Sequence, residues 1–131
     1  MIQNTYKSVT VSNKPYDLKQ RTKNFAIEIL QFTDTLPNKR STNIIANQLG
    51  RSGTSVAANF RASQRAKSTK DFINKLKISE EECDETLFWL EVLQEGHFHK
   101  SVKSEELIKE ANELLAIIVK SIQTTRQNSS K

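Results

Sequence analysis

Residues 48–93 read QLGRSGTSVAANFRASQRAKSTKDFINKLKISEEECDETLFWLEVL and predict two helices packed against each other. No Gly or Pro occurs between Thr54 and Glu95, so capping chemistry has to separate the helices. Ser68 followed by Asp71 resembles a capping box and predicts a turn over residues 65–68. The second helix, predicted over 69–95, has one inward face with steps of four and three. That face comprises Phe72, Leu76, Ser79, Cys83, Thr86, Leu90 and Leu93.

The first of these two helices is predicted to start within residues 38–42 and to end near residue 65. It is rich in small residues and contains both Gly50 and Gly53. Each glycine costs a helix about 1 kcal/mol relative to Ala, so a helix that keeps both is expected to approach a neighbour closely. Its inward positions are Ile45, Leu49, Ser52, Val56, Asn59 and Phe60.

One further amphipathic helix is predicted on each side of this pair. The first follows Asp17 as its N-cap, runs to about residue 35 and is ended by Pro37. Its stripe is Leu18, Thr22, Phe25, Ile29, Phe32 and Leu36. The last follows Gly96, expected as a C′ residue, and is capped by Ser104. Its stripe is Leu107, Ala111, Leu114, Ile118 and Ile122.

These four helices with short connections predict an all-α fold, an antiparallel up-down-up-down four-helix bundle. The length of 131 residues suits one domain over 1–131, with residues 1–15 and 124–131 as flexible ends. Apolar runs are too short to span a bilayer, and no apolar leader segment follows the N-terminus. A single cysteine fits a reducing compartment. We therefore expect a cytoplasmic protein without a membrane partner.

Charge is divided unequally along the chain. Residues 38–77 contain nine basic side chains and one acid, whereas residues 78–113 contain eleven acids and three lysines. Blocks of opposite sign on one small domain can serve self-association, binding of a polyanion, or both.

Enzyme signatures are missing from the sequence. It has no Gly-rich phosphate loop, no HExxH and no paired CxxC. The carboxylates of residues 80–85 lack the Glu-x-x-His spacing of di-iron bundles, so a solvated or interface face is the simpler interpretation. Cys83 is most simply interpreted as a core residue, because it lies on the inward face of its helix. His97 and His99 lie in a predicted loop. We expect no metal, no cofactor and no catalysis.

The basic block is the feature that suggests a binding function. It contains Arg61, Arg65, Lys67, Lys70, Lys75 and Lys77. Such a patch around a helix–helix corner can follow a phosphate backbone, of RNA or DNA. No aromatic residues alternate with the charges, so base stacking is not indicated. The alternative is that this face meets the acidic face of another subunit or a protein partner, and both interpretations stay open.

Two further features concern packing. Asn59 lies near the inward face, where Ser55 one turn earlier is a candidate partner, so both are expected to be structural polar residues that fix register. Several apolar residues exceed the needs of one bundle core and, together with the opposed charges, predict a homo-oligomer closed by unlike faces. These residues are Ile27, Leu30, Ile73, Phe88 and Trp89.

The stretch 48–93 resembles the four-helix-bundle family called 23S rRNA-intervening-sequence proteins. The resemblance rests on Gln48, Leu49, Arg51, Ser52, Ser55, Val56, Asn59, Ser68, Asp71, Phe72, Lys75, Leu76, Glu82, Glu85, Trp89 and Leu90. Members are bacterial, and most have no assigned activity. A related branch, the accessory protein of diversity-generating retroelements, forms a pentameric ring and binds nucleic acid and a reverse transcriptase. The resemblance therefore implies a ring, with a pentamer favoured. In many relatives an acid stands where this chain has Arg61, so surface function differs between branches.

Overall fold

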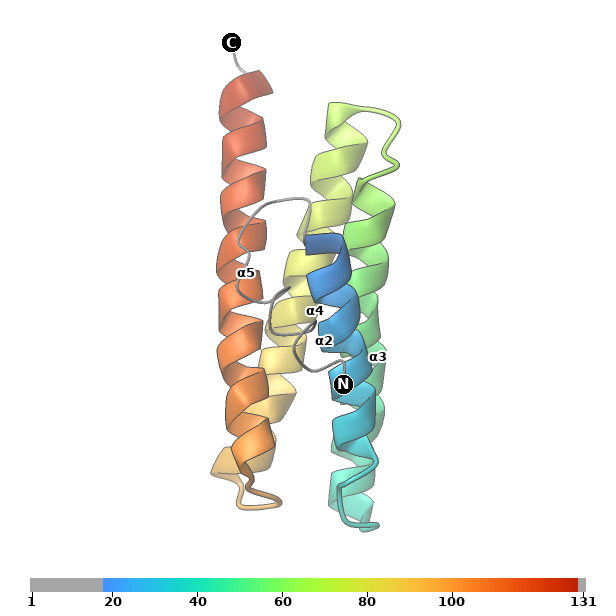
Figure 1. The fold of residues 1–131 in the computed structure, drawn as a ribbon, viewed down its shortest axis with the longest axis vertical. Helices are drawn as coiled ribbons and strands as arrows, with labels where there is room; N and C mark the ends of the chain where they lie inside the picture. The colour runs from blue at the N-terminus through green and yellow to red at the C-terminus, as the bar shows by residue number, and fades with distance from the viewer. Residues whose placement is uncertain (1–17, 130–131) are drawn as a thin grey trace, which may run out of the picture.

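The computed structural model describes residues 18–129, which form four helices and no strand. The helices are α2 (Leu18–Thr33), α3 (Arg40–Ser63), α4 (Thr69–Glu95) and α5 (Val102–Ser129). They lie along one long axis, and each packs against the next in the chain (Figure 1). The predicted all-α fold is confirmed. The predicted Asp17 cap and the segment 1–15 lie outside the described residues.

The predicted stripes form the core. Every stripe position listed for α4 is buried except Phe72, which is half-buried, and the five stripe positions of α5 are all buried. Leu36, the last position of the stripe predicted for the first helix, is half-buried, because α2 ends at Thr33 and Leu36 lies in the loop that follows. Hydrophobic periodicity therefore identified the inward faces of the helices correctly.

Buried hydroxyl groups join α3 to α4 within the core. Thr86 Oγ1 donates to Ser52 Oγ at 2.8 Å, and Ser52 Oγ in turn donates to the carbonyl of Gln48 at 2.9 Å. A second bond joins the helices one turn later in α3 and two turns earlier in α4, where Ser79 Oγ donates to the carbonyl of Val56 at 2.8 Å. Because buried polar groups need partners, these bonds favour one register of the two helices over any shifted one.

The close approach expected at the glycines occurs at one of them. A Cβ added to Gly53 would lie 2.9 Å from Cγ2 of the fully buried Ile29, so this glycine allows α2 and α3 to pack closely. At Gly50 the nearest atom to such a Cβ is Leu30 Cδ2 at 3.5 Å, which is ordinary contact. The expectation is therefore correct for Gly53 and wrong for Gly50.

Local hydrogen bonds decide where the helices end. At α4 the prediction is confirmed: Ser68 is the N-cap, and its hydroxyl accepts from the Asp71 N–H at 3.0 Å. The Asp71 carboxylate accepts from the N–H of Lys67 rather than of Ser68. Helix α2 ends at Thr33, two residues before the predicted end, and α3 likewise ends at Ser63.

The connection from α4 to α5 corrects the prediction that Gly96 is the C′ residue of α4. Gly96 is the C-cap with a right-handed φ of −80°, whereas His97 takes the left-handed position with φ of 59°. The Phe98 and His97 N–H groups donate to the carbonyls of Leu93 and Gln94, a Schellman motif. A Cβ on Gly96 would collide with the Phe98 ring at 2.4 Å, so close approach explains this glycine.

Helix α5 starts before the predicted cap and ends after the predicted end. Ser104 lies inside it, and the cap is Ser101: the Ser101 hydroxyl accepts from the Ser104 N–H, and the Ser104 hydroxyl accepts from the Ser101 N–H. Residues 124–129, expected as a flexible end, continue the helix through Ser129. Their polar sequence gives no periodicity signal, but it contains no helix breaker.

The two glycines of α3 give a matched test of this packing. Gly50→Ala should stabilise the protein by about 0.5–1 kcal/mol, because helix propensity improves without a clash. Gly53→Ala gains the same propensity but forces Ile29 to move, and overpacking costs about 1–3 kcal/mol, so we expect net destabilisation. Urea unfolding followed by circular dichroism measures both. Equal effects at the two positions would contradict the close α2–α3 contact.

Candidate nucleic-acid interface

The six predicted basic residues surround the junction between α3 and α4. Arg61 lies in the last turn of α3, Arg65 and Lys67 lie in the connecting turn, and the other three lie in the first turns of α4. All are exposed except Lys75, which is half-buried. The ion pairs within residues 18–129 use other cations, namely Arg21, Arg51 and Lys103. No carboxylate of residues 18–129 forms an ion pair with this group, although the Asp71 carboxylate lies at the same junction and accepts from the backbone N–H of Lys67.

The structure distributes these cations over several surfaces. Arg61 lines a hollow of about 190 Å³ together with Lys19 and Lys23 of α2, two cations that the sequence prediction did not include. Lys67 lines a second hollow, of about 380 Å³, at the α3–α4 turn beside Thr125 of α5. Lys77 lies on the outer face of α4. The six predicted basic residues thus lie on several sides of the α3–α4 end of the bundle and do not form one flat patch. We call these six residues the cationic end.

The outer face of α4 has an acidic stripe further along the helix. Exposed positions recur there with steps of three and four, which keeps them on one face. After Lys77, this acidic stripe comprises Glu81, Asp84, Phe88, Glu91 and Glu95. Phe88 is 52% exposed in the middle of four acids, with its ring edge-to-face against Trp89 at 5.0 Å. An apolar group so placed is a candidate for contact with another molecule.

A separate polar cluster joins α3 to α4 at the surface. Arg51 pairs with Glu82 at 3.2 Å and also with Glu85, and Trp89 Nε1 donates to Glu85 at 3.2 Å. The hydrogen bond from Arg51 lowers the pKa of the Glu85 carboxyl, and Glu85 raises the pKa of Arg51. Because these charges are paired, Arg51 is less available to a phosphate than the cations at the α3–α4 junction.

Asn59 and Ser55 are bonded to each other, as the sequence suggested, but within one helix and not across the bundle. Asn59 Nδ2 donates to the carbonyl of Ser55 at 2.9 Å and to its hydroxyl at 3.0 Å. Both residues are half-buried, and the contact lies within one turn of α3. The pair therefore satisfies its own polar groups locally, and the register between helices depends on Ser52, Ser79 and Thr86 instead.

A buried ion pair that the sequence did not reveal joins α2 to α5. Arg21 is only 3% exposed, and its guanidinium donates to both oxygens of Glu110 at 2.7 and 2.8 Å. It also donates to Glu113 at 2.7 Å. These contacts, Glu110 first, raise the pKa of Arg21 above its ordinary value, so it stays charged. This pair holds together two helices that share few other contacts.

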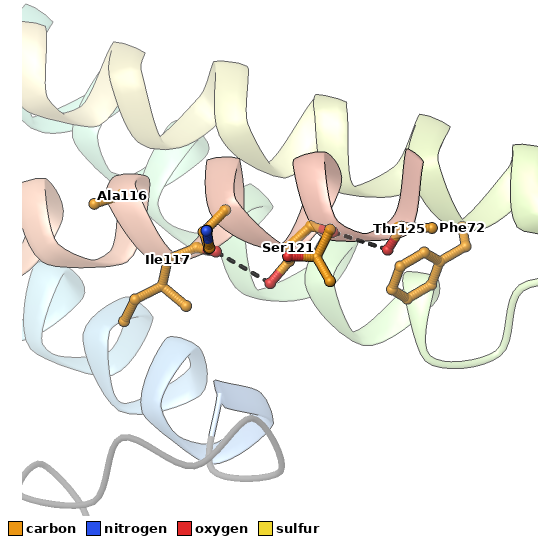
Figure 2. Close-up of a pocket in the computed structure, with 7 residues that line it drawn as sticks. Phe72, Ala116, Ile117, Ser121 and Thr125 are labelled. Carbon is orange, nitrogen blue, oxygen red and sulfur yellow. Dashed lines mark hydrogen bonds between the residues drawn. The ribbon is translucent and has the colours of Figure 1, made fainter. Parts of the chain in front are cut away.

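A third hollow lies along α5 beyond the start of α2. Helix α2 has 16 residues, about 24 Å, whereas α5 has 28, about 42 Å, so α2 cannot cover all of α5 (Figure 1). The hollow of about 520 Å³ is lined by Phe72 of α4 and by α5 residues that include Ile117. Two of its hydroxyls are bonded within α5: Ser121 donates to the Ile117 carbonyl and Thr125 to that of Ser121 (Figure 2). Besides its apolar side chains, the lining also includes Lys120 and Thr124.

Cys83 and the carboxylates of the described residues form no metal-binding group. Within residues 18–129, no group of three or more His, Cys, Asp or Glu side chains could hold a metal ion. Cys83 is fully buried and donates to the Ala111 carbonyl at 3.4 Å. Burial, and then the charge of Asp84, raises the pKa of its thiol to about 12. No described helix is long and apolar enough to cross a membrane.

The buried thiol gives a direct test of the core. At pH 8 Cys83 should react with Ellman's reagent far more slowly than a free thiol, because both burial and its raised pKa suppress the thiolate. Unfolding in urea should restore rapid reaction, and the chain has one cysteine, so the signal is unambiguous. Rapid reaction of the folded protein would contradict the described packing.

Comparisons with known proteins show which family and which fold the chain is similar to. The family model described as 23S rRNA-intervening sequence protein matches residues 14–120. A solved structure from Bacteroides thetaiotaomicron, a protein of unknown function from the S23 ribosomal protein family, is similar with a TM-score of 0.73 and 33% identity. The similarity covers 79% of this chain and 96% of that one. Among curated proteins, none matches this chain.

Proposed function

The chain belongs to the 23S rRNA-intervening sequence protein family, and on that premise we propose that it is a non-enzymatic, oligomeric protein that binds nucleic acid. The observation that supports binding is the cationic end of the bundle, where six exposed or half-exposed cations have no carboxylate partner among the described residues. Lysine and arginine in such a group neutralise phosphates and release counterions from them. Recognition is then independent of sequence, because phosphate contacts position a nucleic acid without reading its bases.

RNA is the nucleic acid that we favour, in a cytoplasmic setting. The proposed contacts reach the backbone, which DNA also offers, so either can be bound. The helix order and the short connections support an antiparallel up-down-up-down topology, in which the α3–α4 junction occupies one end of the bundle. The alternative function is a structural or protein-interaction module whose charged faces serve subunit or partner contacts.

Salt dependence tests nucleic-acid binding quantitatively. If about four to six side chains neutralise phosphates, log affinity should fall with log salt at a slope of roughly −3 to −5. Changing both Arg65 and Lys67 to Ala should flatten that slope by about one to two units, equally for unrelated sequences. Fluorescence anisotropy with a labelled RNA measures both values.

A matched control removes two cations from the opposite end of the bundle, one in the α2–α3 connection and one in the α4–α5 connection (Figure 1). Lys39 and Lys100 are exposed and lie in connections far from Arg65, about 36 Å along a helix of 24 residues. Changing both to Ala removes the same charge and should leave the slope near that of the wild type. An affinity that does not depend on salt would refute the proposal.

Self-association is the second proposal, and the exposed Phe88 favours it. This ring lies within the acidic stripe, while Ile27 and Leu30 of α2 are 44% and 46% exposed. The other two surplus residues, Ile73 and Trp89, are half-buried against the core and contribute less. A contact between the acidic stripe and a cationic or apolar face of a second copy joins unlike faces, which close into a ring when the rotation permits. The pentamer count comes from the resemblance to the retroelement accessory proteins.

Light scattering coupled to size exclusion tests the assembly. At micromolar concentration the wild type should have the mass of an oligomer, most simply a pentamer. Phe88→Glu should lower that mass, because it removes about 1 kcal/mol of apolar burial per contact and adds like charge to the stripe. Val102→Glu is the control, because Val102 is 71% exposed but lies outside the stripe. A monomeric wild type would refute the proposal.

A further inference from the structure

The hollow between α2 and α3 gathers three cations around an apolar floor. Lys19 and Lys23 enter it from α2, and Arg61 enters it from α3. The apolar part of the lining is Ala57, which is half-buried, and Ala58, which is exposed, and their short side chains leave the hollow open. No carboxylate of residues 18–129 lines the hollow, and its volume is about 190 Å³.

The electrostatics of the hollow favour a bound anion. Lys19 lies in the first turn of α2, which contains no acid, and a cation is unfavourable at the positive end of the helix macrodipole. Lys23 follows four residues later on the same face, and like charges at that spacing repel each other. Arg61 adds a third positive charge. None of the three takes part in an ion pair within residues 18–129.

We propose that Lys19, Lys23 and Arg61 form a phosphate site that holds the backbone of a nucleic acid against the α2–α3 face. This site rests on the proposed function and extends it to α2. A guanidinium fork with two ammonium groups suits the oxygens of a phosphodiester. Arg65 follows Arg61 by four residues, in the turn directly beyond the end of α3. A strand that leaves the hollow therefore meets the cations of the α3–α4 turn next.

The test compares two double variants in RNA binding. The probe is a 5′-labelled single-stranded RNA of 20 nucleotides, followed by fluorescence anisotropy over a series of salt concentrations. Changing both Lys19 and Lys23 to Ala should flatten the salt slope by about 1.4, since each single-strand phosphate contact contributes about 0.7, and should weaken binding at least tenfold at low salt. The variant with Lys39 and Lys100 changed to Ala should behave as the wild type. Circular dichroism verifies that both fold.

A second probe keeps the site testable without RNA. Inorganic pyrophosphate added to the ¹⁵N-labelled protein should shift the amide resonances of residues 57–61, and these shifts should be lost in the Lys19 and Lys23 double variant. If the wild type binds no RNA, the proposed function fails, and the pyrophosphate titration alone decides whether the hollow binds phosphate. Absence of shifts there would overturn the site.

Two other outcomes would also overturn the site while leaving nucleic-acid binding in place. The double variant could keep the wild-type slope and affinity, in which case phosphates bind only around the α3–α4 turn. The double variant could instead keep its RNA affinity but show a lower oligomer mass in light scattering. That result would assign the hollow to carboxylates of a second copy, because the acidic stripe of α4 offers the complementary charge.

Discussion

The buried hydrogen bonds between α3 and α4 are the constraint on which the rest of the structure depends. Apolar stripes alone would tolerate a shift of one helix along the other, because Leu, Ile and Val contacts can be exchanged. Such a shift would leave the buried hydroxyl of Ser79 without the Val56 carbonyl, at a cost of about 1–3 kcal/mol. It would also break the bond between Thr86 and Ser52, although each of these two hydroxyls has a second partner within its own helix. The register that they favour also brings Arg51 opposite Glu82 and Glu85. It thereby fixes how the surfaces of the two helices are combined.

Most of the fold could be predicted from local sequence signals. The bounds of α4 followed from the Ser68 cap and from the apolar stripe, both of which act within a few residues. The errors fall at helix ends, where competing local bonds decide the outcome. Ser101 and Ser104 are both good cap residues, and only the paired bonds between them show that the first is the cap. His97 and not Gly96 takes the left-handed position, whereas the lack of a side chain at Gly96 makes room for the ring of Phe98.

The candidate site could be predicted by residue type but not by placement. Charge counting identified the cations of the α3–α4 junction, yet it could not show that Arg61 lies beside Lys19 and Lys23, since helix pairing brings them together. The spacing of those lysines on the outer face of α2 was the available signal. Arg21 was missed for the same reason: its partner Glu110 is 89 residues away, and periodicity within one helix reveals nothing about such a pair.

The most direct test of the central claim is to measure whether nucleic acid co-purifies with the untagged protein. The chain has one Trp and two Tyr, so its own absorbance is low and bound nucleic acid changes the ratio of absorbance at 260 and 280 nm strongly. We predict a ratio typical of a nucleic-acid complex after purification at low salt, lowered by a high-salt wash, with RNA identified in the eluate by nuclease treatment. A protein free of nucleic acid at low salt would contradict the account and favour a module whose charged faces bind only other protein chains.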